Sequence, residues 1–377
     1  MRIVQKYGGS SVADVPRIKG VAARVASARQ AGHEVVVVVS AMGNTTNELL
    51  ALARQLSASP GRRELDMLLS VGERVTMALL AMALQELGVS ARSFTGSQSG
   101  IITDTAHSSA RVVEVRPERI EAALQAGEVV IVAGFQGVSR DREVTTLGRG
   151  GSDTTAVVLA AALRADECEL CSDVDGIWSA DPRTVPSAVK LDELSLDEAL
   201  AMARNGSRIL FEEAVAWAHR EGIQLRASRT EGGGSGSVVR PGAAPRPSRA
   251  RAVVRDSELL FAPIGVLSGL EVPCVRAAGP WGAVLDARNL HTPVPAAVQV
   301  ATVAVVGAGI GASPEWVQSA LAAAEVSLAE PPIGWWSSAD AVVLVVKSSA
   351  AASLERHLHF SFVERSGNSE ESCSDSS

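Results

Sequence analysis

The amino-acid sequence predicts an α/β protein: a three-layer α/β/α sandwich with a mostly parallel central sheet, followed by a small α+β domain. From residue 1 to about residue 228, short apolar runs alternate with segments of helical periodicity, as parallel strands joined by crossover helices require. Two of these runs, 35–39 and 129–133, are apolar at every position, which is typical of strands buried on both faces. Near residue 230 the alternation stops.

The expected elements follow from local patterns. Strands are expected at the N-terminus up to residue 7, then over 35–39, 129–133 and 165–172. Helical spacing of apolar residues predicts helices over 15–30, 63–86, 117–125, 154–163 and 197–220. These patterns predict four regions: a first domain over 1–228, a Gly/Pro/Arg-rich linker over 229–250, a small α+β region over 251–363 and a disordered acidic, Ser-rich tail over 364–377.

Composition excludes several classes of function. The chain has 377 residues, 46% of them hydrophobic, so it can bury a core without disulfides. Aromatic residues make up 3% and the formal net charge is −7, so a nucleic-acid partner is not expected. No apolar stretch of signal-peptide length precedes the first charges, and no later run approaches the roughly 18 apolar residues of a membrane span. We therefore expect a cytoplasmic protein without a membrane partner.

Cysteine and histidine do not predict a metal site. Cys168 and Cys171 form a C-x-x-C, but they lie on an expected strand, where positions three apart point to opposite faces. His357 and His359 have no third ligand in view. Zinc and redox chemistry are therefore not expected.

Polar, glycine-rich turns follow several of the expected strands. Lys6, Gly8 and Gly9 form a turn between a strand and a helix, which can cradle a phosphate, although glycines also serve tight turns for backbone reasons alone. Small polar groups follow the second strand over 40–47, and further turns occupy 134–137 and 145–155. Because ligands bind at the carboxyl edge of open α/β sheets, we expect these turns to form one site.

Two of the turns carry charged groups suited to ligands. Arg149 lies among three glycines, where a guanidinium can hold a carboxylate through two hydrogen bonds. Ser152 or Asp153 can cap the helix that follows, with or without a role in binding. The segment 172–183 combines three acids, Trp178 and Arg183, which suits a purine nucleotide or an ordinary acidic turn.

Six ordered segments together resemble the aspartate kinases (aspartokinases) of the amino-acid kinase superfamily. They are 6–12 (KYGGSSV), 39–50 (VSAMGNTTNELL), 70–73 (SVGE), 134–137 (GFQG), 145–156 (TTLGRGGSDTTA) and 172–183 (SDVDGIWSADPR). The resemblance implies the amino-acid kinase fold and transfer of the γ-phosphoryl group of ATP to the side-chain carboxylate of L-aspartate. The product would be 4-phospho-L-aspartate, in the first step of aspartate-family amino-acid biosynthesis.

The resemblance also implies roles for single residues. Lys6 would stabilise the transferring phosphoryl group, and Asp153 and Glu73 would face the substrate amino group or order Lys6. Arg149 would hold the substrate α-carboxylate. The remaining substrate-binding residues would be Ser40, Thr46, Asn47 and Phe135. The nucleotide, ATP with Mg²⁺, would be bound by Gly8, Gly9, Ser10, Ser172, Asp173, Trp178, Asp181, Arg183 and Arg208. No dedicated metal-ligand cluster is visible.

The chain departs from the family pattern in two places. Arg208 replaces the usual Lys, and Phe211 and Glu212 replace part of a usual Leu-His-Pro, so nucleotide affinity or turnover is expected to differ. The segment 298–346 resembles an ACT regulatory domain, whereas its expected partner copy, 251–295, is short and poorly matched. We therefore expect weak or absent feedback by lysine or threonine, and a homodimer formed through the ACT-like region.

Three rival functions remain open. Residues 307–312 fit the dinucleotide fingerprint G-x-G-x-x-A, with Glu325 near the position of the ribose acid, but too few residues follow for that fold. A catalytically silent regulatory or binding subunit would fit the altered Arg208 segment. A kinase of glutamate or N-acetylglutamate would share the fold, but the 145–153 loop does not support it.

Overall fold

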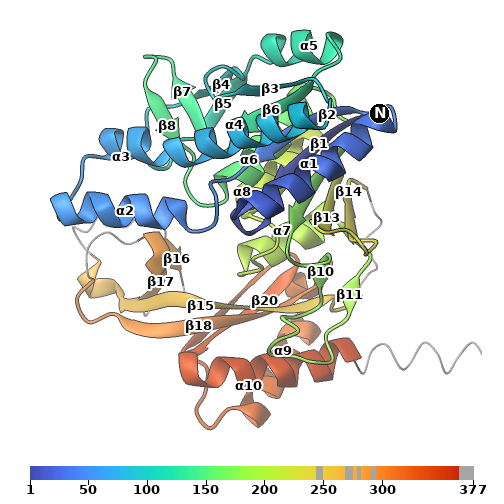
Figure 1. Ribbon diagram of the computed structural model, residues 1–377. Helices are drawn as coiled ribbons and strands as arrows, with labels where there is room; N and C mark the ends of the chain where they lie inside the picture. Colours follow the sequence, from blue (N-terminus) through green and yellow to red (C-terminus); the bar gives the residue numbers. More distant parts are fainter. Residues whose placement is uncertain (243–248, 268–274, 278–281, 290–293, 365–377) are drawn as a thin grey trace, which may run out of the picture. The chain divides into compact units, whose positions relative to one another are not determined.

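The computed structural model describes residues 1–242, 249–267, 275–277, 282–289 and 294–364 (Figure 1). The chain divides into two compact units. Unit 1 comprises Met1–Ile177, Asp192–Leu196 and Ile209–Gly242. Unit 2 comprises Trp178–Leu191, Asp197–Arg208 and Ala243–Ser377. Each unit is built around its own sheet.

The central sheet of unit 1 has eight strands in the order β12-β14-β13-β9-β1-β2-β6-β3. In chain order these strands are β1 (Arg2–Tyr7), β2 (Glu34–Val39), β3 (Ala91–Phe94), β6 (Val129–Ala133), β9 (Glu167–Ser172), β12 (Glu193–Ser195), β13 (Leu225–Arg229) and β14 (Ser237–Arg240). All neighbours pair in parallel except β13 and β14, which are antiparallel. The expected mostly parallel sheet is confirmed.

Helices of unit 1 cover both faces of this sheet. They are α1 (Val15–Gln30), α2 (Thr45–Leu56), α3 (Arg62–Leu69), α4 (Val71–Glu86), α5 (Glu118–Gln125), α6 (Gly151–Ala162) and α8 (Glu212–Glu221). Helix α1 starts at an N-cap, Asp14, whose side chain accepts a hydrogen bond from the backbone N–H of Arg17. Its buried residues Ile18, Val21 and Val25 recur at helical spacing and face the sheet.

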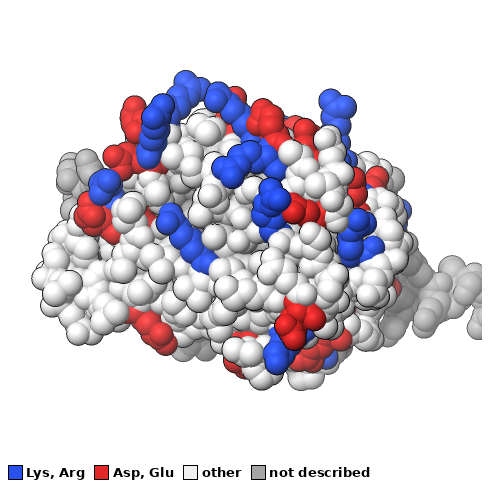
Figure 2. All heavy atoms as spheres, turned by 45° about the horizontal axis from the view of Figure 1, so that its top comes forward, with Lys and Arg blue, Asp and Glu red and all other residues white. Residues whose placement is uncertain are grey.

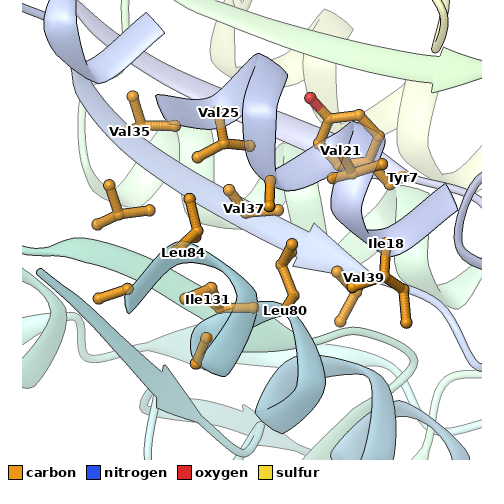
Figure 3. Close-up of a cluster of buried hydrophobic side chains, with 14 of the residues drawn as sticks. Tyr7, Ile18, Val21, Val25, Val35, Val37, Val39, Leu80, Leu84 and Ile131 are labelled. Atoms are coloured by element: carbon orange, nitrogen blue, oxygen red, sulfur yellow. The ribbon is translucent and has the colours of Figure 1, made fainter. Parts of the chain in front are cut away.

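The valine run in β2 explains why both faces must be covered. Val35, Val37 and Val39 pack against α1 and α4, as Figure 3 shows, while Val36 and Val38 are equally buried. A Cβ at Gly134 would lie near both Val38 and Ser152, which places Val38 on the side of α6. Each fully buried aliphatic side chain of this kind contributes about 1.5–3 kcal/mol. The three-layer α/β/α arrangement is therefore confirmed for unit 1.

A second, four-stranded sheet in unit 1 was not expected from the sequence. It has the order β5-β4-β7-β8, with β4 (Ile101–Thr103), β5 (Val112–Val115), β7 (Gln136–Ser139) and β8 (Val144–Thr146). These strands have three or four residues each, too short for a clear alternation. The 134–137 turn thus leads directly into β7.

Several expected helices have different bounds in the structure. The segment 63–86 forms two helices, α3 and α4, which meet at Ser70. The segment 197–220 also forms two, α7 (Leu196–Arg204) and α8, separated where Gly206 has a φ of 109°, outside helical geometry. Helix α6 starts at Gly151 after the N-cap Gly150, so the expectation that Ser152 or Asp153 caps it is wrong. Helix α2 was not expected.

One helical stretch, Arg62–Glu86, is long and apolar enough to cross a membrane by length and composition. The expectation that no run approaches this length is therefore wrong. Half of its most apolar window is buried within the protein, and Leu80 and Leu84 of α4 belong to the core cluster against β2. This burial is what a core helix of an α/β unit shows.

Unit 2 contains an antiparallel sheet of six strands in the order β16-β17-β15-β18-β20-β19. They are β15 (Ala252–Pro263), β16 (Val275–Ala277), β17 (Gly282–Asp286), β18 (Val298–Val306), β19 (Gly334–Ser338) and β20 (Ala341–Lys347). Helices α9 (Pro314–Ser327) and α10 (Ser348–His359) pack against β15, β18 and β20 through a buried cluster. The expected α+β character is confirmed. Short strands β10 (Ile177–Trp178) and β11 (Lys190–Leu191) pair with each other.

The expected domain boundaries differ from this division. Strand β14 lies inside 229–250, so this segment is not a linker throughout, and its residues 243–248 lie outside the described residues. Residues 178–191 and 197–208, expected in the first domain, belong to unit 2. The expected tail lies outside the described residues from residue 365 onward.

The dinucleotide-binding alternative does not fit the structure. Strand β18, which precedes the 307–312 loop, pairs antiparallel with both β15 and β20. The fingerprint requires a parallel strand–helix–strand unit. Gly311 instead serves close packing, since a Cβ there would overlap the backbone oxygens of Ser338 and Ala341.

Candidate active site

Lys6 and Asp153 form an ion pair at the carboxyl edge of the central sheet. Lys6 is the penultimate residue of β1, and Asp153 lies in the first turn of α6. The Lys6 Nζ and Asp153 Oδ1 atoms are 2.7 Å apart, and the side chains are only 14% and 4% exposed. A charge this buried is costly without a partner, so each residue holds the other in place. Of the two acids expected to order Lys6, Asp153 is therefore the one bonded to it.

The glycines after β1 leave space beside the Lys6 ammonium group. A Cβ at Gly8 would lie 3.5 Å from Lys6 Nζ, so any side chain there would enter this space. A Cβ at Gly9 would approach the backbone oxygens of Ala41 and Gly43 to 3.0 and 3.2 Å. Gly43 N donates to Gly9 O at 3.1 Å, which joins the turn after β1 to the turn after β2. The two turns thus form one rigid edge.

Glu73 lies behind the turn after β2. Its Oε1 accepts a hydrogen bond from Ala41 N at 3.1 Å, while its Oε2 has no hydrogen-bond partner among the described residues. Burial raises the pKa of Glu73 to about 7. A buried acceptor without a partner is uncommon in proteins and marks a position where a ligand donor can bind.

The Arg149 loop, residues 147–150, joins β8 to α6. Gly148 and Gly150 have φ values of 76° and 75°, which favour glycine, and Arg149 between them is exposed. Leu147 N donates to Phe135 O at 2.9 Å, which ties the loop to the turn before β7. A Cβ at Gly150 would lie 2.3 Å from Cγ of Phe211, so the Phe211 departure packs directly against this loop.

Phe135 itself has an unusual backbone. Its φ of 67° is rare for a residue with a side chain. Its N–H donates to Oγ1 of Thr155 at 3.1 Å, and that hydroxyl donates to Gly151 O at 2.7 Å. Backbone strain of this kind persists where the surroundings require it, often at binding sites.

Three further residues expected at the substrate site lie at or just after the end of β2. Ser40 is half-buried, and its N–H donates to Tyr7 O at 3.1 Å. Thr46 and Asn47 lie in the first turn of α2 rather than in a loop. The amide of Asn47 donates to Oδ1 of Asn44 at 2.6 Å.

Three of the expected nucleotide-binding residues, Ser10, Ser172 and Asp173, line a cavity of about 610 Å³ in unit 1. Sequence reasoning missed further lining residues, among them Arg17, Arg24 and Thr230. Arg24 donates to the backbone oxygens of Arg229 and Thr230 and to Glu169. Its position on α1 carries no local signal for this role, because the contact depends on how α1 packs beside β13.

Besides Gly8 and Gly9, described above, four further expected nucleotide-binding residues belong to unit 2. Trp178 packs against Ala180, Val185 and Ala188. Arg183 pairs with Asp181 at 2.8 Å. Arg208 lies 3.2 Å from Glu258 of β15.

The cysteines do not add chemistry to the site. Cys168 and Cys171 are both buried and not disulfide-bonded, and burial raises the pKa of the Cys171 thiol to about 12. Cys171 belongs to the core cluster on the α1 side of the sheet. In the part of the chain that the structure describes, no group of three or more His, Cys, Asp or Glu side chains is arranged to hold a metal ion.

Surface charges are mixed in sign. On the face drawn in Figure 2, Lys and Arg side chains lie beside Asp and Glu. Exposed ion pairs among the described residues include Arg116 with Glu114 and Arg63 with Glu143.

Known proteins with this arrangement identify the family. A family model described as the amino acid kinase family matches residues 1–226. The chain belongs to the amino acid kinase family.

Several curated relatives that resemble this chain in sequence are named aspartokinases. The aspartokinase of Mycolicibacterium smegmatis is 54% identical over 239 residues, which are 63% of this chain and 57% of that protein. The chain thus spans little more than half the length of the curated relatives it matches. Aspartate kinase from Synechocystis is 32% identical with a TM-score of 0.60, covering 96% of this chain and 69% of that one.

Escherichia coli aspartokinase III, solved in complex with aspartate and ADP, has the same fold. Its TM-score is 0.81 at 22% identity, and the match covers 96% of this chain and 99% of that one. At this identity the likeness concerns the fold alone. The amino-acid kinase fold expected from the sequence is therefore confirmed.

Proposed function

We propose that this family member transfers the γ-phosphoryl group of ATP to the side-chain carboxylate of L-aspartate, giving 4-phospho-L-aspartate and ADP. The relatives that are more than half identical to it are aspartokinases, and Escherichia coli aspartokinase III binds aspartate and ADP. The observation that carries the proposal is the buried Lys6–Asp153 ion pair next to Gly8. Because Gly8 has no side chain, space for a phosphate remains beside the Lys6 ammonium group.

The reaction needs charge stabilisation rather than a general base. L-Aspartate is ionised at neutral pH, so a carboxylate oxygen attacks the γ-phosphorus directly while the bond to the bridging oxygen breaks and ADP leaves with the electron pair. The Lys6 ammonium group stabilises the negative charge on the transferring phosphoryl oxygens. Asp153 orients Lys6, and the Gly8 and Gly9 backbone lets the phosphates approach.

The acceptor pocket recognises an amino acid by its two backbone charges. Arg149 holds the α-carboxylate through a bidentate pair of hydrogen bonds from its guanidinium group. Oε2 of Glu73, which has no partner among the described residues, accepts a hydrogen bond from the α-ammonium group. Phe135, Ser40, Thr46 and Asn47 complete the pocket around the four-carbon chain.

The nucleotide side rests on the glycine turn and the cavity beside it. A cavity of about 610 Å³ lined by Ser10, Ser172 and Asp173 is large enough for part of a nucleotide. The nucleotide contacts expected of Trp178, Asp181, Arg183 and Arg208, which belong to unit 2, stay predictions. Mg²⁺ neutralises phosphate charge in such reactions, and it is held mainly by phosphate oxygens and water with few protein ligands.

Unit 2 serves as a weakened regulatory region in this proposal. Its β18, α9, β19 and β20 correspond to the ACT-like segment, and lysine or threonine inhibits weakly or not at all. Trp335 on the edge strand β19 is 46% exposed, which fits a homodimer formed through this sheet, and sizing in solution tests that state. We place the enzyme in the cytoplasm.

An assay of ADP release tests the proposed activity. Purified protein receives MgATP with L-aspartate, L-glutamate or N-acetyl-L-glutamate, and only L-aspartate is expected to give rapid ADP release. Lys6→Ala should abolish turnover, whereas Lys19→Ala, an exposed lysine on α1, should not. Absence of ADP release with every substrate would favour a silent regulatory subunit, and near-normal rates for Lys6→Ala would refute the role of Lys6.

A further inference from the structure

Asp66 is a fully buried acid that the proposed reaction leaves without a role. It lies in α3, and none of its side chain is exposed. A buried carboxylate is stable only when its oxygens are hydrogen-bonded. Those bonds come from two chain segments far from α3 in sequence.

The first segment is the turn at residues 107–108. Nδ1 of His107 lies 2.6 Å from Oδ2 of Asp66. The backbone N–H of Ser108 donates to both carboxylate oxygens, at 3.0 and 3.1 Å. This turn also borders the Arg149 loop, because a Cβ at Gly148 would lie 3.4 Å from Ser108 O.

The second segment is the end of β8. Oγ1 of Thr146 donates to Oδ1 of Asp66 at 2.6 Å. Thr146 O accepts a hydrogen bond from Ala110 N at 2.9 Å, so this residue is held by both its side chain and its backbone. Arg149 follows three residues later in the chain, after Leu147, whose N–H donates to Phe135 O.

Helix α3, whose residue Asp66 provides this carboxylate, leads through its backbone to the other end of the acceptor pocket. Ser70 N donates to Asp66 O at 3.1 Å, and α4 begins at the next residue and carries Glu73. Ser70 O accepts a hydrogen bond from the amide of Gln136 at 2.9 Å, beside Phe135. The Asp66 carboxylate therefore fixes the end of β8 that leads to Arg149 against α3, and α3 continues into α4, which carries Glu73.

We propose that Asp66 is a positioning residue that sets the Arg149 loop at the distance from Glu73 that an α-amino acid requires. This inference rests on the proposed function, because it assigns substrate affinity to a residue that does not touch the substrate. Loosening the Asp66 contacts should weaken binding of L-aspartate while leaving the Lys6 turn and the ATP contacts as they are.

Two neighbouring threonines provide a matched pair of variants. Thr146→Val removes the hydroxyl that donates to Asp66 and keeps the side-chain shape. Thr145→Val removes an equally buried hydroxyl on the same strand, which bonds Oγ1 of Thr103 at 2.6 Å instead. Asp66→Asn replaces one carboxylate oxygen by an NH₂ group, which would face the N–H and O–H donors that bind Asp66. This variant should therefore weaken L-aspartate binding in the same way as Thr146→Val, and more strongly.

Steady-state kinetics of these variants test the proposal. Thr146→Val should raise the KM for L-aspartate about tenfold, the effect expected from loss of one hydrogen bond to a carboxylate, with the KM for ATP unchanged. Thr145→Val should leave both KM values near those of the wild type. An unchanged KM for L-aspartate in Thr146→Val, or equal changes in both KM values, would overturn the proposal.

Amide hydrogen exchange separates this proposal from the proposed function, since it needs no substrate. Exchange across residues 147–151 should be faster in Thr146→Val than in Thr145→Val or the wild type. If the wild type releases no ADP with L-aspartate, the proposed function fails and the exchange result still decides whether Asp66 positions the loop. Equal exchange in both variants would refute the positioning role even in an active enzyme.

Discussion

Replacing Glu73 by glutamine should stabilise the protein at pH 8 and much less at pH 5. Burial raises the pKa of Glu73 from 4.5 to about 7 in the folded protein. The folded state therefore binds this proton more tightly than the unfolded state. The stability that this group contributes is fully present below pH 4.5 and is lost as the pH rises to about 7.

The magnitude follows from the size of the pKa shift. At 1.36 kcal/mol per unit, keeping Glu73 ionised in the folded state at pH 8 costs about 3 kcal/mol, and less than about 1 kcal/mol remains at pH 5. Glutamine keeps an acceptor for Ala41 N and carries no charge. At this position, a protonated glutamate and a glutamine each leave one hydrogen-bond donor without a partner. The free-energy costs of burying the two side chains at low pH are therefore similar.

Calorimetric unfolding of wild type and Glu73→Gln at the two pH values measures this difference. The variant should unfold about 6–12 °C higher at pH 8, since 1 kcal/mol shifts the midpoint of a unit this size by about 2–4 °C. Glu86→Gln, an exposed glutamate on the same helix, is the control and should show no pH-dependent gain. If the unfolding midpoints of Glu73→Gln and wild type differ by the same amount at pH 5 and pH 8, the pH-dependent cost assigned to Glu73 is refuted.

Two further predictions concern the Arg149 loop and regulation. Gly150→Ala should lower the stability of unit 1 by about 2–4 kcal/mol, because it adds a left-handed backbone cost to an overlap with the Phe211 ring. Gly148→Ala, with the same φ but 3.4 Å of space to Ser108 O, should cost only about 1–2 kcal/mol, and equal losses in thermal unfolding would contradict this account. L-Lysine and L-threonine, added singly or together at millimolar concentration to the ADP-release assay, should leave the rate nearly unchanged. Strong inhibition at low concentration would show that the ACT-like region still senses them.

Local patterns were sufficient for the elements that make the core. The five valines of 35–39 and the apolar run 129–133 predicted strands buried on both faces, and each is a central strand flanked by helices. Helix α1 has the expected bounds because its cap and its apolar spacing are both local. Local patterns failed where one turn interrupts a helical rhythm, as at Gly206, and where strands are too short to alternate, as in β4 and β8.

Site residues divide in the same way. Lys6, Gly8 and Arg149 were singled out from the sequence because a strand end followed by glycine, or a charge between glycines, is a local signal, whereas the role of Asp153 came from the family resemblance, and all four roles stay predictions. Asp66 was not found, because an acid between apolar residues on a helix resembles any exposed acid until the fold buries it. The cavity-lining Arg17 and Arg24 were missed for the same reason.

The sequence by itself determined the α/β class, the strands of the apolar runs 35–39 and 129–133 and the turns that carry charge, since each depends on residues close together in the chain. Only the tertiary structure decided that Asp153 rather than Glu73 pairs with Lys6, that Glu73 keeps an oxygen without a described partner, and that Asp66 bonds side chains 41 and 80 residues away. Those outcomes depend on tertiary packing. Packing brings some side chains within hydrogen-bond distance of one another and removes others from water.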